Sequence, residues 1–380
     1  MKSMKFLTKR RIEAVVFLIV FFGFFGFLGS KMGLPNMMNT IMQTAYSLLI
    51  ETVLYIMAIT VVSGALGNLL VEFGVVRLIE VVLRPLMKPL YNLPGVAALG
   101  GVMTFLSDNP AIISLSKDAH FARYFKKYQL ISLTNFGTAF GMGLVVIMFM
   151  MGKGYLPAAL VGLVGAVIGS IMSTRLMQRF ILKSNPELNV EISTEKGDEE
   201  KISFKSEGSA FLRFLNAILD GGKSGVDIGL AIIPGVLIIS TVVMMLTFGA
   251  APDGSYTGAA YEGVALLPYL ADKIDFVFKW LFGFENPQLV AFPITALGAV
   301  GAALGLVPRF IQEGIIDGNA IAVFTAMGMC WSGYLSTHTA MLDSLGFRSL
   351  TSKAILAHTV GGLVAGIAAH WLFVLFSMIF

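Results

Sequence analysis

The sequence predicts an all-α integral membrane protein with about seven transmembrane helices plus two re-entrant hairpins, arranged as an inverted-topology repeat. Three observations predict this class. Of the 380 residues, 56% are hydrophobic and 13% are charged, which is far more apolar than a soluble domain. The apolar residues form long runs that are separated by short basic segments. Two of these runs are interrupted at matching places in the two halves of the chain.

Composition also argues against several other classes. The formal net charge is +4, but the basic residues lie between apolar runs, where they orient membrane helices, so we expect no nucleic-acid partner. The single cysteine, Cys330, excludes a disulfide framework within the chain, and the four histidines lack metal-ligand spacing. No P-loop and no arrangement of nucleophile, base and oxyanion donor is present, so we do not expect an enzyme.

Residues 1–45 are predicted to form an N-terminal membrane helix and an external loop. Five Lys and Arg residues within positions 1–12 precede the apolar run 14–28, a pattern shared by signal peptides and signal anchors. Because no small-residue cleavage site follows, we expect an uncleaved first helix with a cytoplasmic N-terminus and with residues 30–42 outside. A cleaved signal peptide is the alternative.

Residues 46–183 form the first predicted repeat. Its elements are a span over 46–71, an amphipathic interfacial helix over 73–87, a hairpin over 89–113, and spans over 129–151 and 156–177. The basic run 120–127 follows the hairpin on the same side as the N-terminus, which a re-entrant segment explains and a full crossing does not.

A polar, charged stretch over residues 184–215 is predicted to be a cytoplasmic linker, and residues 216–380 form the second, inverted repeat. The elements of that repeat are a span over 226–248 with a kink at Pro234-Gly235, an interfacial helix over 266–284, a hairpin over 287–311, and spans over 320–336 and 354–376. The loop 249–263 has no Lys or Arg, as expected outside the membrane.

The first hairpin centres on Ser107-Asp108-Asn109-Pro110. The apolar arm before it is too short to cross about 30 Å of hydrocarbon at about 1.5 Å per residue, so the two arms and their polar turn predict a re-entrant hairpin. An offset of 198 positions aligns this stretch with residues 287–311 without a gap and places the second turn at 305–308.

The same offset extends the repeat into the following spans. It pairs the run Thr134, Phe136 and Thr138 with Ser332, Tyr334 and Ser336. In the closing spans, a Gly-x-x-x-Gly pattern at 165–169 lies opposite another at 362–366, which predicts close helix packing in each half. Chance similarity between apolar, glycine-rich segments is the alternative. An inverted repeat lets one fold open to either side of the membrane.

The order of amphipathic helix, hairpin, polar-interrupted span and closing span, repeated and inverted, resembles the nucleoside-recognition or Gate-domain membrane proteins, which include the concentrative nucleoside transporters. The resemblance implies the architecture and leaves the substrate open. It implies that the hairpin tips and the two interrupted spans hold solute and a cation. The implied substrate-binding residues are Ser107, Asn109, Thr134, Asn135, Gln312, Glu313, Ser332, Ser336 and Thr337; the implied cation-binding residues are Asp108, Asn109, Asn135 and Thr138.

Asp108 is the strongest candidate for a chemical role. An ionised carboxylate at the bilayer centre costs about 2.5–3.5 kcal/mol unless water, a cation or helix ends compensate it. Asp108 and Asn109 could simply cap the second arm, with Pro110 as its first helical residue. Alternatively, the carboxylate and nearby oxygens hold a hard cation such as sodium. Capping and coordination are compatible.

The polar runs of the two interrupted spans have two interpretations as well. Small polar residues allow close helix packing, and they also mark unwound segments that face a binding site. Glu313 lies five residues after Pro308 and reaches either the cavity or the external interface, while His338 is expected to be an interfacial residue rather than a proton relay.

These observations predict a secondary active transporter in the cytoplasmic (inner) membrane, driven by a sodium or proton gradient. A channel or gate-like component that acts with a partner protein is the alternative. The expected partners are a small-molecule solute and the lipid bilayer, and the close-packing faces predict a homo-oligomer. No cofactor is expected, apart from Na⁺ as a coupling ion.

Overall fold

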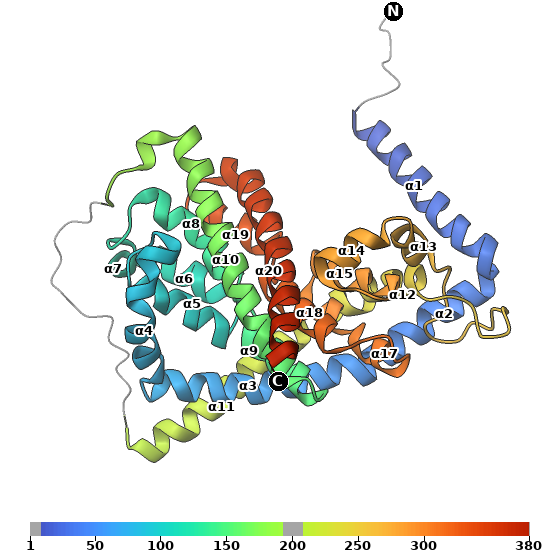
Figure 1. The fold of residues 1–380 in the computed structure, drawn as a ribbon, viewed down its shortest axis with the longest axis horizontal. Helices are drawn as coiled ribbons and strands as arrows, with labels where there is room; N and C mark the ends of the chain where they lie inside the picture. The colour runs from blue at the N-terminus through green and yellow to red at the C-terminus, as the bar shows by residue number, and fades with distance from the viewer. Residues whose placement is uncertain (1–8, 193–207, 380) are drawn as a thin grey trace, which may run out of the picture.

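The computed structural model describes residues 9–192 and 208–379, and within these ranges every regular element is a helix. The only extended pairing there is an isolated antiparallel bridge between Lys126 and Glu191. Figure 1 shows a long helix along one side of the molecule, two groups of shorter helices above it, and a pair of long helices between the groups. The predicted all-α fold class is confirmed.

Six helices of the described chain are long and apolar enough to cross a membrane: Lys9–Met32, Leu34–Glu72, Lys127–Gly152, Leu156–Ser184, Ala210–Thr247 and Arg348–Ile379. The predicted sixth span is different, because it consists of α18 (Gly318–Cys330) and α19 (Ser336–Ser344) with a break between them. The third span is also interrupted, between α8 (Lys127–Thr138) and α9 (Gly143–Gly152). Both spans with central polar residues are therefore discontinuous helices.

The predicted external loop at residues 30–42 is wrong. Helix α1 (Lys9–Met32) is followed at once by α2 (Leu34–Ser47), which continues through the π-helical segment η1 (Leu48–Val53) into α3 (Leu54–Glu72). Gly33 makes the turn with φ 78°, and Pro35 lies in the first turn of α2. A proline is favourable there because the first helical N–H groups have no acceptor within the helix.

The other elements of the first half follow the predicted order. They are α4 (Val75–Leu86), η2 (Met87–Tyr91), α5 (Ala97–Leu106), α6 (Pro110–Lys117), α7 (Ala119–Ala122), the α8–α9 pair and α10 (Leu156–Ser184). The break between α5 and α6 covers residues 107–109, at the predicted turn of the first hairpin. Pro110 starts α6, so the local sequence decided this break.

The predicted linker ends earlier than expected. After η3 (Pro186–Leu188), residues 193–207 lie outside the described ranges, and α11 (Ala210–Ala231) begins before the predicted boundary at 215. The Ser209 side chain caps this helix by accepting a hydrogen bond of 3.3 Å from Leu212 N–H. Later elements are η4 (Gly235–Ser240), α12 (Thr241–Thr247), α13 (Leu266–Asp272), α14 (Asp275–Phe282), η5 (Pro287–Val290), α15 (Ala291–Ala296), α16 (Val300–Leu304), α17 (Val307–Gln312), the α18–α19 pair, η6 (Arg348–Leu350) and α20 (Thr351–Ile379).

In the predicted second hairpin, the extended break lies eight residues before the predicted turn. Helix α15 ends at Ala296 and α16 starts at Val300, with Ala299 extended at φ −166° and ψ 126°. At the predicted turn, by contrast, Gly305 and Leu306 keep right-handed helical angles. The gap-free alignment matches Pro110 to Pro308, but Pro308 lies in the first turn of the later helix α17 (Val307–Gln312). The offset between equivalent breaks is therefore 190 positions, from Asn109 to Ala299, and not 198.

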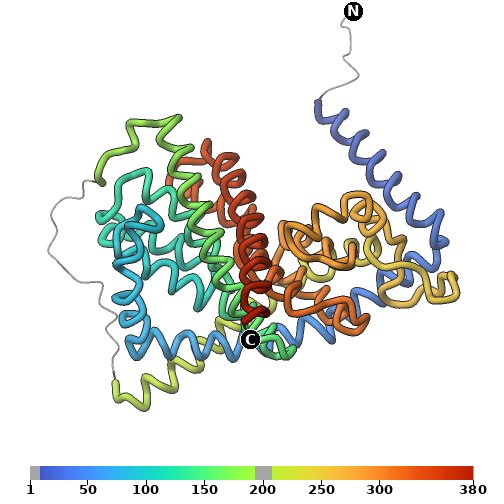
Figure 2. The backbone as a smooth tube through the Cα atoms, viewed as in Figure 1, coloured from blue at the N-terminus to red at the C-terminus, as the bar shows by residue number. Residues whose placement is uncertain are grey.

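The closing helices of the two halves, α10 and α20, pack against each other at the centre of the molecule (Figure 2). Gly165 and Gly169 of α10 approach Ala365 and the Gly361 carbonyl of α20. The predicted close packing is therefore present, but α20 uses Gly361 for it. Gly362 instead faces Trp331, directly after α18, and Gly366 faces Met327 of α18.

A second close pair is formed by α3 and α11, which lie side by side along one edge of the molecule (Figure 1). Glycines allow the contact: a Cβ atom on Gly64 would overlap the carbonyl of Gly221, and one on Gly225 would overlap the carbonyl of Thr60. The Thr60 hydroxyl donates a 2.6 Å hydrogen bond to the Gly225 carbonyl. We call these two helices the α3–α11 pair.

Candidate functional site

A cavity of about 540 Å³ lies where the breaks of the two halves meet. This volume falls within the roughly 300–1,000 Å³ usual for ligand pockets. Its wall combines the break of the first hairpin, the break of the second hairpin at residues 298–301, the interrupted sixth span and the middle of α11. The polar side chains that line it are Asp108, Asn109, Ser224, Asp227, Ser332, Ser336 and Thr337.

Asn109 joins the first hairpin to the sixth span. Its Nδ2 donates to the Ser332 carbonyl at 3.3 Å and contacts the Ser332 hydroxyl at 3.2 Å. A Cβ atom on Gly141 or on Gly333 would lie 2.5 Å from the Asn109 amide, so these two glycines make room for it. Gly141 belongs to the break between α8 and α9, and Gly333 to the break between α18 and α19. Asn109 is thus inserted between the two interrupted spans.

Asp108 precedes Asn109 at the same break and is half-buried. One carboxylate oxygen accepts a 3.0 Å hydrogen bond from Asn109 Nδ2. Helix α6 starts without a side-chain capping bond from Asn109, so that residue does not serve as the predicted cap. Among the described residues, no Lys or Arg forms an ion pair with Asp108.

The predicted residues of the third span lie elsewhere. Thr134, Asn135 and Thr138 are fully buried and do not line the cavity. Asn135 Nδ2 donates to the Ser173 hydroxyl and to the Ala354 carbonyl, both at 2.9 Å, so its side chain faces α10 and α20. Thr138 donates to the Thr134 carbonyl at 2.5 Å. The structure therefore does not bring Asn135 or Thr138 to the cavity beside Asp108.

Asn135 instead belongs to a buried polar network behind the sixth span. His358 Nε2 donates to the Cys330 carbonyl, so Nδ1 of a neutral ring accepts from Ser173 at 2.9 Å. His338 Nδ1 donates to the Tyr334 carbonyl at 2.6 Å. The two histidines thus satisfy carbonyl groups that the break leaves without helical partners. The expected interfacial position of His338 is wrong, because its side chain is 0% exposed and packs against His358.

The two predicted residues of the second hairpin, Gln312 and Glu313, do not line the cavity either. Glu313 pairs with Arg309 at 2.8 Å, and the Arg309 guanidinium lies over the rings of Phe248 and Tyr261. These positions follow from the shifted turn: the residues that reach the cavity from this hairpin are at 298–301, and they carry no polar side chain.

Sequence reasoning missed the contribution of α11. Ser224 and Asp227 line the cavity from this helix. Asp227 lies inside the predicted fifth span, and an ionisable residue within an apolar span marks a candidate site. That signal was available in the sequence. The residues that face Asp227 across the cavity could not be predicted, because they depend on packing between helices distant in sequence.

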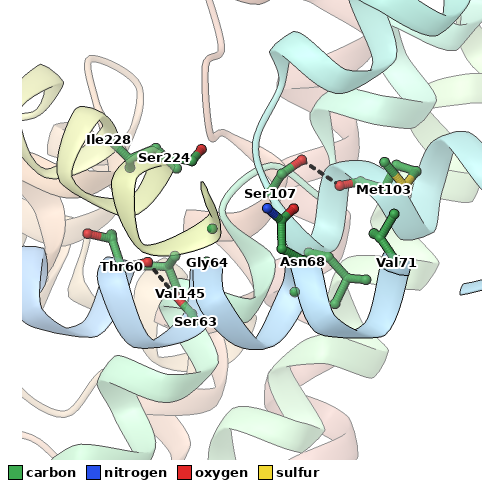
Figure 3. Close-up of a pocket in the computed structure, with 13 residues that line it drawn as sticks. Thr60, Ser63, Gly64, Asn68, Val71, Met103, Ser107, Val145, Ser224 and Ile228 are labelled. Carbon is green, nitrogen blue, oxygen red and sulfur yellow. Dashed lines mark hydrogen bonds between the residues drawn. The ribbon is translucent and has the colours of Figure 1, made fainter. Parts of the chain in front are cut away.

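Ser107 points into a second, smaller cavity of about 50 Å³ between α3, α11 and the first hairpin (Figure 3). Hydroxyl and amide side chains of Thr60, Ser63, Asn68 and Ser224 line it as well. The Ser107 hydroxyl donates to the Met103 carbonyl at 2.6 Å, which leaves its oxygen lone pairs able to accept. Because roughly 15 Å³ suffices for one water molecule, this chamber has room for water beside the hairpin break.

Comparison with known proteins supports the fold. No family model matches the chain. An uncharacterised protein of Alkalihalophilus pseudofirmus is 24% identical over 219 residues, which cover 55% of this chain and 47% of the relative. The matched region thus spans about half the length of this curated relative.

Solved structures of CNTnw, a concentrative nucleoside transporter, are similar over most of the chain. An inward-facing, substrate-bound structure has a TM-score of 0.53 at 14% identity and covers 83% of this chain and 74% of that one. An outward-facing double variant has a TM-score of 0.57 at 13% identity and covers 97% and 85%. This protein is a multi-pass membrane protein with the fold of the concentrative nucleoside transporters.

Proposed function

We propose that this protein is a secondary active transporter that moves a small polar solute across the cytoplasmic membrane, coupled to a sodium or proton gradient. The observation that carries the proposal is the cavity itself, in which a hairpin break and an interrupted span meet beside α11. Discontinuous helices that meet in this way offer unpaired backbone groups and polar side chains to a solute within the membrane. The structural neighbours are transporters, which favours this function over a channel component.

Two parts of the molecule can move relative to each other in this mechanism. Helix α11, packed against α3, provides one wall of the cavity, and the hairpin breaks with the interrupted spans provide the other. Movement of the hairpin part along the α3–α11 pair would open the cavity to one side of the membrane and then to the other. The inverted repeat gives both hairpins an equivalent part in this motion.

Energy for accumulation would come from the coupling ion. One monovalent cation moving down about 100 mV releases about 2.3 kcal/mol. A tenfold concentration gradient adds about 1.4 kcal/mol. Together these terms concentrate a neutral solute by two to three decades. We assign Asp108 as the carboxylate that binds this ion, with Asn109 beside it, because no basic residue of the described chain neutralises Asp108.

Purified protein in proteoliposomes tests the proposal. We expect uptake of at least one polar solute to depend on an imposed sodium or proton gradient and to stop when an ionophore dissipates that gradient. Equal uptake with and without both gradients would contradict secondary active transport and would support a channel instead.

A further inference from the structure

The charged side chains that line the main cavity are all acidic. Asp108 and Asp227 both line it, and its wall contains no Lys, Arg or His and no aromatic ring. Among the described residues, neither carboxylate forms an ion pair. Lys223, one turn before Asp227 on α11, does not line the cavity. The wall therefore carries carboxylates without a basic side chain beside them, which favours a cationic ligand over an anionic one.

Asn109 offers no free donor to an anionic ligand in the cavity. Asn109 is 5% exposed, and its Oδ1 accepts no hydrogen bond. Its Nδ2 is already used by Asp108 and Ser332. The Oδ1 atom is itself enclosed and lies beside Gly141, so this amide has no free group for a ligand in the cavity. A carboxylate or phosphate ligand is negatively charged at neutral pH. It would meet the carboxylates of Asp108 and Asp227, which carry the same sign of charge.

We propose that the transported solute is a small organic cation that bears an ammonium group, and that Asp227 is its counter-charge. This inference rests on the proposed function. An ammonium group supplies up to three N–H donors and one positive charge. A charged ligand leaves water only if the site provides an opposite charge together with hydrogen-bond acceptors. With Asp108 occupied by the coupling ion, Asp227 is the carboxylate that remains for the solute.

The two carboxylates lie on different elements, which suits separate roles in binding the coupling ion and the solute. Asp108 lies on the first hairpin and Asp227 on α11, so a solute held between them contacts both walls of the cavity. Ser224, one turn before Asp227, and Thr337 of α19 add hydroxyl oxygens as neutral acceptors. The residues that line the cavity include no aromatic ring, so a nucleobase would find no stacking surface there.

Three probes with a chain of four methylene groups, which differ only in their end groups, test this assignment: putrescine with two ammonium groups, 1,4-butanediol with two hydroxyls, and adipate with two carboxylates. Binding to the purified full-length protein in nanodiscs would be measured by calorimetry and by thermal stabilisation. We expect putrescine to bind and the other two probes to bind at least about tenfold more weakly, as the loss of a charged hydrogen bond implies.

Substitutions then identify the counter-charge. Asp227→Asn should weaken putrescine binding at least about tenfold while sodium- or proton-dependent stabilisation persists. Asp227→Glu keeps the charge and should retain binding, which guards against loss through misfolding. Asp220→Asn, on the same helix but outside the cavity, is the matched control and should bind like wild type.

Tighter binding of butanediol or adipate than of putrescine would overturn the inference, and so would a lack of any putrescine effect at millimolar concentration. An Asp227→Asn protein that binds putrescine like wild type would overturn the role of Asp227. Gradient-driven uptake of a neutral solute alone would contradict this inference and leave the transporter proposal intact. Putrescine binding without gradient-driven uptake would support the ligand inference and contradict the transporter proposal.

Discussion

Asn109 occupies the point at which three interrupted elements meet. It belongs to the first hairpin, hydrogen-bonds to Ser332 of the sixth span, and lies against Gly141 of the third span. The two N–H groups of its amide reach the Ser332 carbonyl, the Ser332 hydroxyl and the Asp108 carboxylate. The adjacent Asp108 carboxylate is then held at the cavity by a hydrogen bond from the same amide.

Asp108→Asn should leave folding intact and remove ion dependence. The substitution keeps the size of the side chain and an oxygen that can accept the hydrogen bond from Asn109 Nδ2, so the free energy of unfolding should change by no more than about 1 kcal/mol. The cation loses its full negative ligand, so sodium- or proton-dependent thermal stabilisation should disappear. The exposed Asp343→Asn on α19 is the control. If Asp108→Asn keeps full ion dependence, the coupling site lies elsewhere.

Gly141→Ala should displace Asn109. A Cβ atom there would lie 2.5 Å from both the nitrogen and the oxygen of the Asn109 amide. Forcing an atom into a packed site costs about 1–3 kcal/mol, which thermal unfolding in detergent would measure. The double variant Gly141→Ala with Asn109→Ala should recover part of that loss, because the overlap is removed. Additive effects of the two substitutions would show that Gly141 and Asn109 are not coupled.

Among the structural elements, the α3–α11 pair and the loop between α12 and α13 are each held together by specific contacts. The pair is a close helix contact that glycine makes possible. The loop is organised around Glu262, which is 6% exposed and accepts hydrogen bonds from Thr257 and Gly258. Asn36 of α2 donates to the Tyr256 carbonyl at 2.7 Å and ties the loop to the N-terminal helices.

Gly225→Ala should separate α3 from α11, since its Cβ atom would overlap the Thr60 carbonyl and its neighbouring atoms. We expect a loss of about 1–3 kcal/mol in stability together with slower transport. Gly222→Ala on the same helix is the matched control: its Cβ would have an ordinary contact of 3.7 Å with Val61. A melting temperature for Gly225→Ala equal to that of the control would argue against the close contact.

Glu262→Gln should destabilise the loop in a pH-dependent way. Burial alone would raise the pKa of Glu262, but hydrogen bonds from Thr257 and Gly258 lower it below its ordinary value of 4.5. The ionised carboxylate therefore stabilises the folded loop above pH 4.5, and this contribution is lost as pH falls through the lowered pKa.

We expect the difference in melting temperature between wild type and Glu262→Gln to be largest near neutral pH and to vanish in acid. The exposed Glu285→Gln provides a control that should show no such trend. A difference that grows as the pH falls would have the wrong sign for a lowered pKa.

At the scale of the whole molecule, the two halves have the same order of elements. Each has a long span, one or two short helices, a broken hairpin, an interrupted span and a 29-residue closing helix, α10 in the first half and α20 in the second. The interrupted spans and the first hairpin converge on one cavity, and α11 of the second half closes it. The proposed binding site would then lie between the two halves, a position that suits alternating access.

Inverted topology predicts opposite sides for two loops. Positive residues flank the ends of the proposed spans that face the cytoplasm, so Lys127 should be cytoplasmic and Asp253 external. Lys127→Cys and Asp253→Cys, each in a Cys330→Ala background, would be labelled in intact cells with a membrane-impermeant maleimide. Only the Asp253→Cys protein should react before the cells are opened. Labelling of both positions from the same side would refute the inverted repeat.

The sequence by itself determined the membrane class, the apolar spans and the first hairpin break, because these depend on composition and on local chemistry such as Pro110 at a helix start. Tertiary structure decided the rest. The second hairpin turns at Ala299, where no proline or polar residue marks a break, since its position is fixed by packing against η4 and α18. The rotation of α8 directs Asn135 toward Ser173 and away from Asp108. Asp227 reaches the cavity only because α11 lies against α3, and such contacts between distant helices are not encoded in any local pattern.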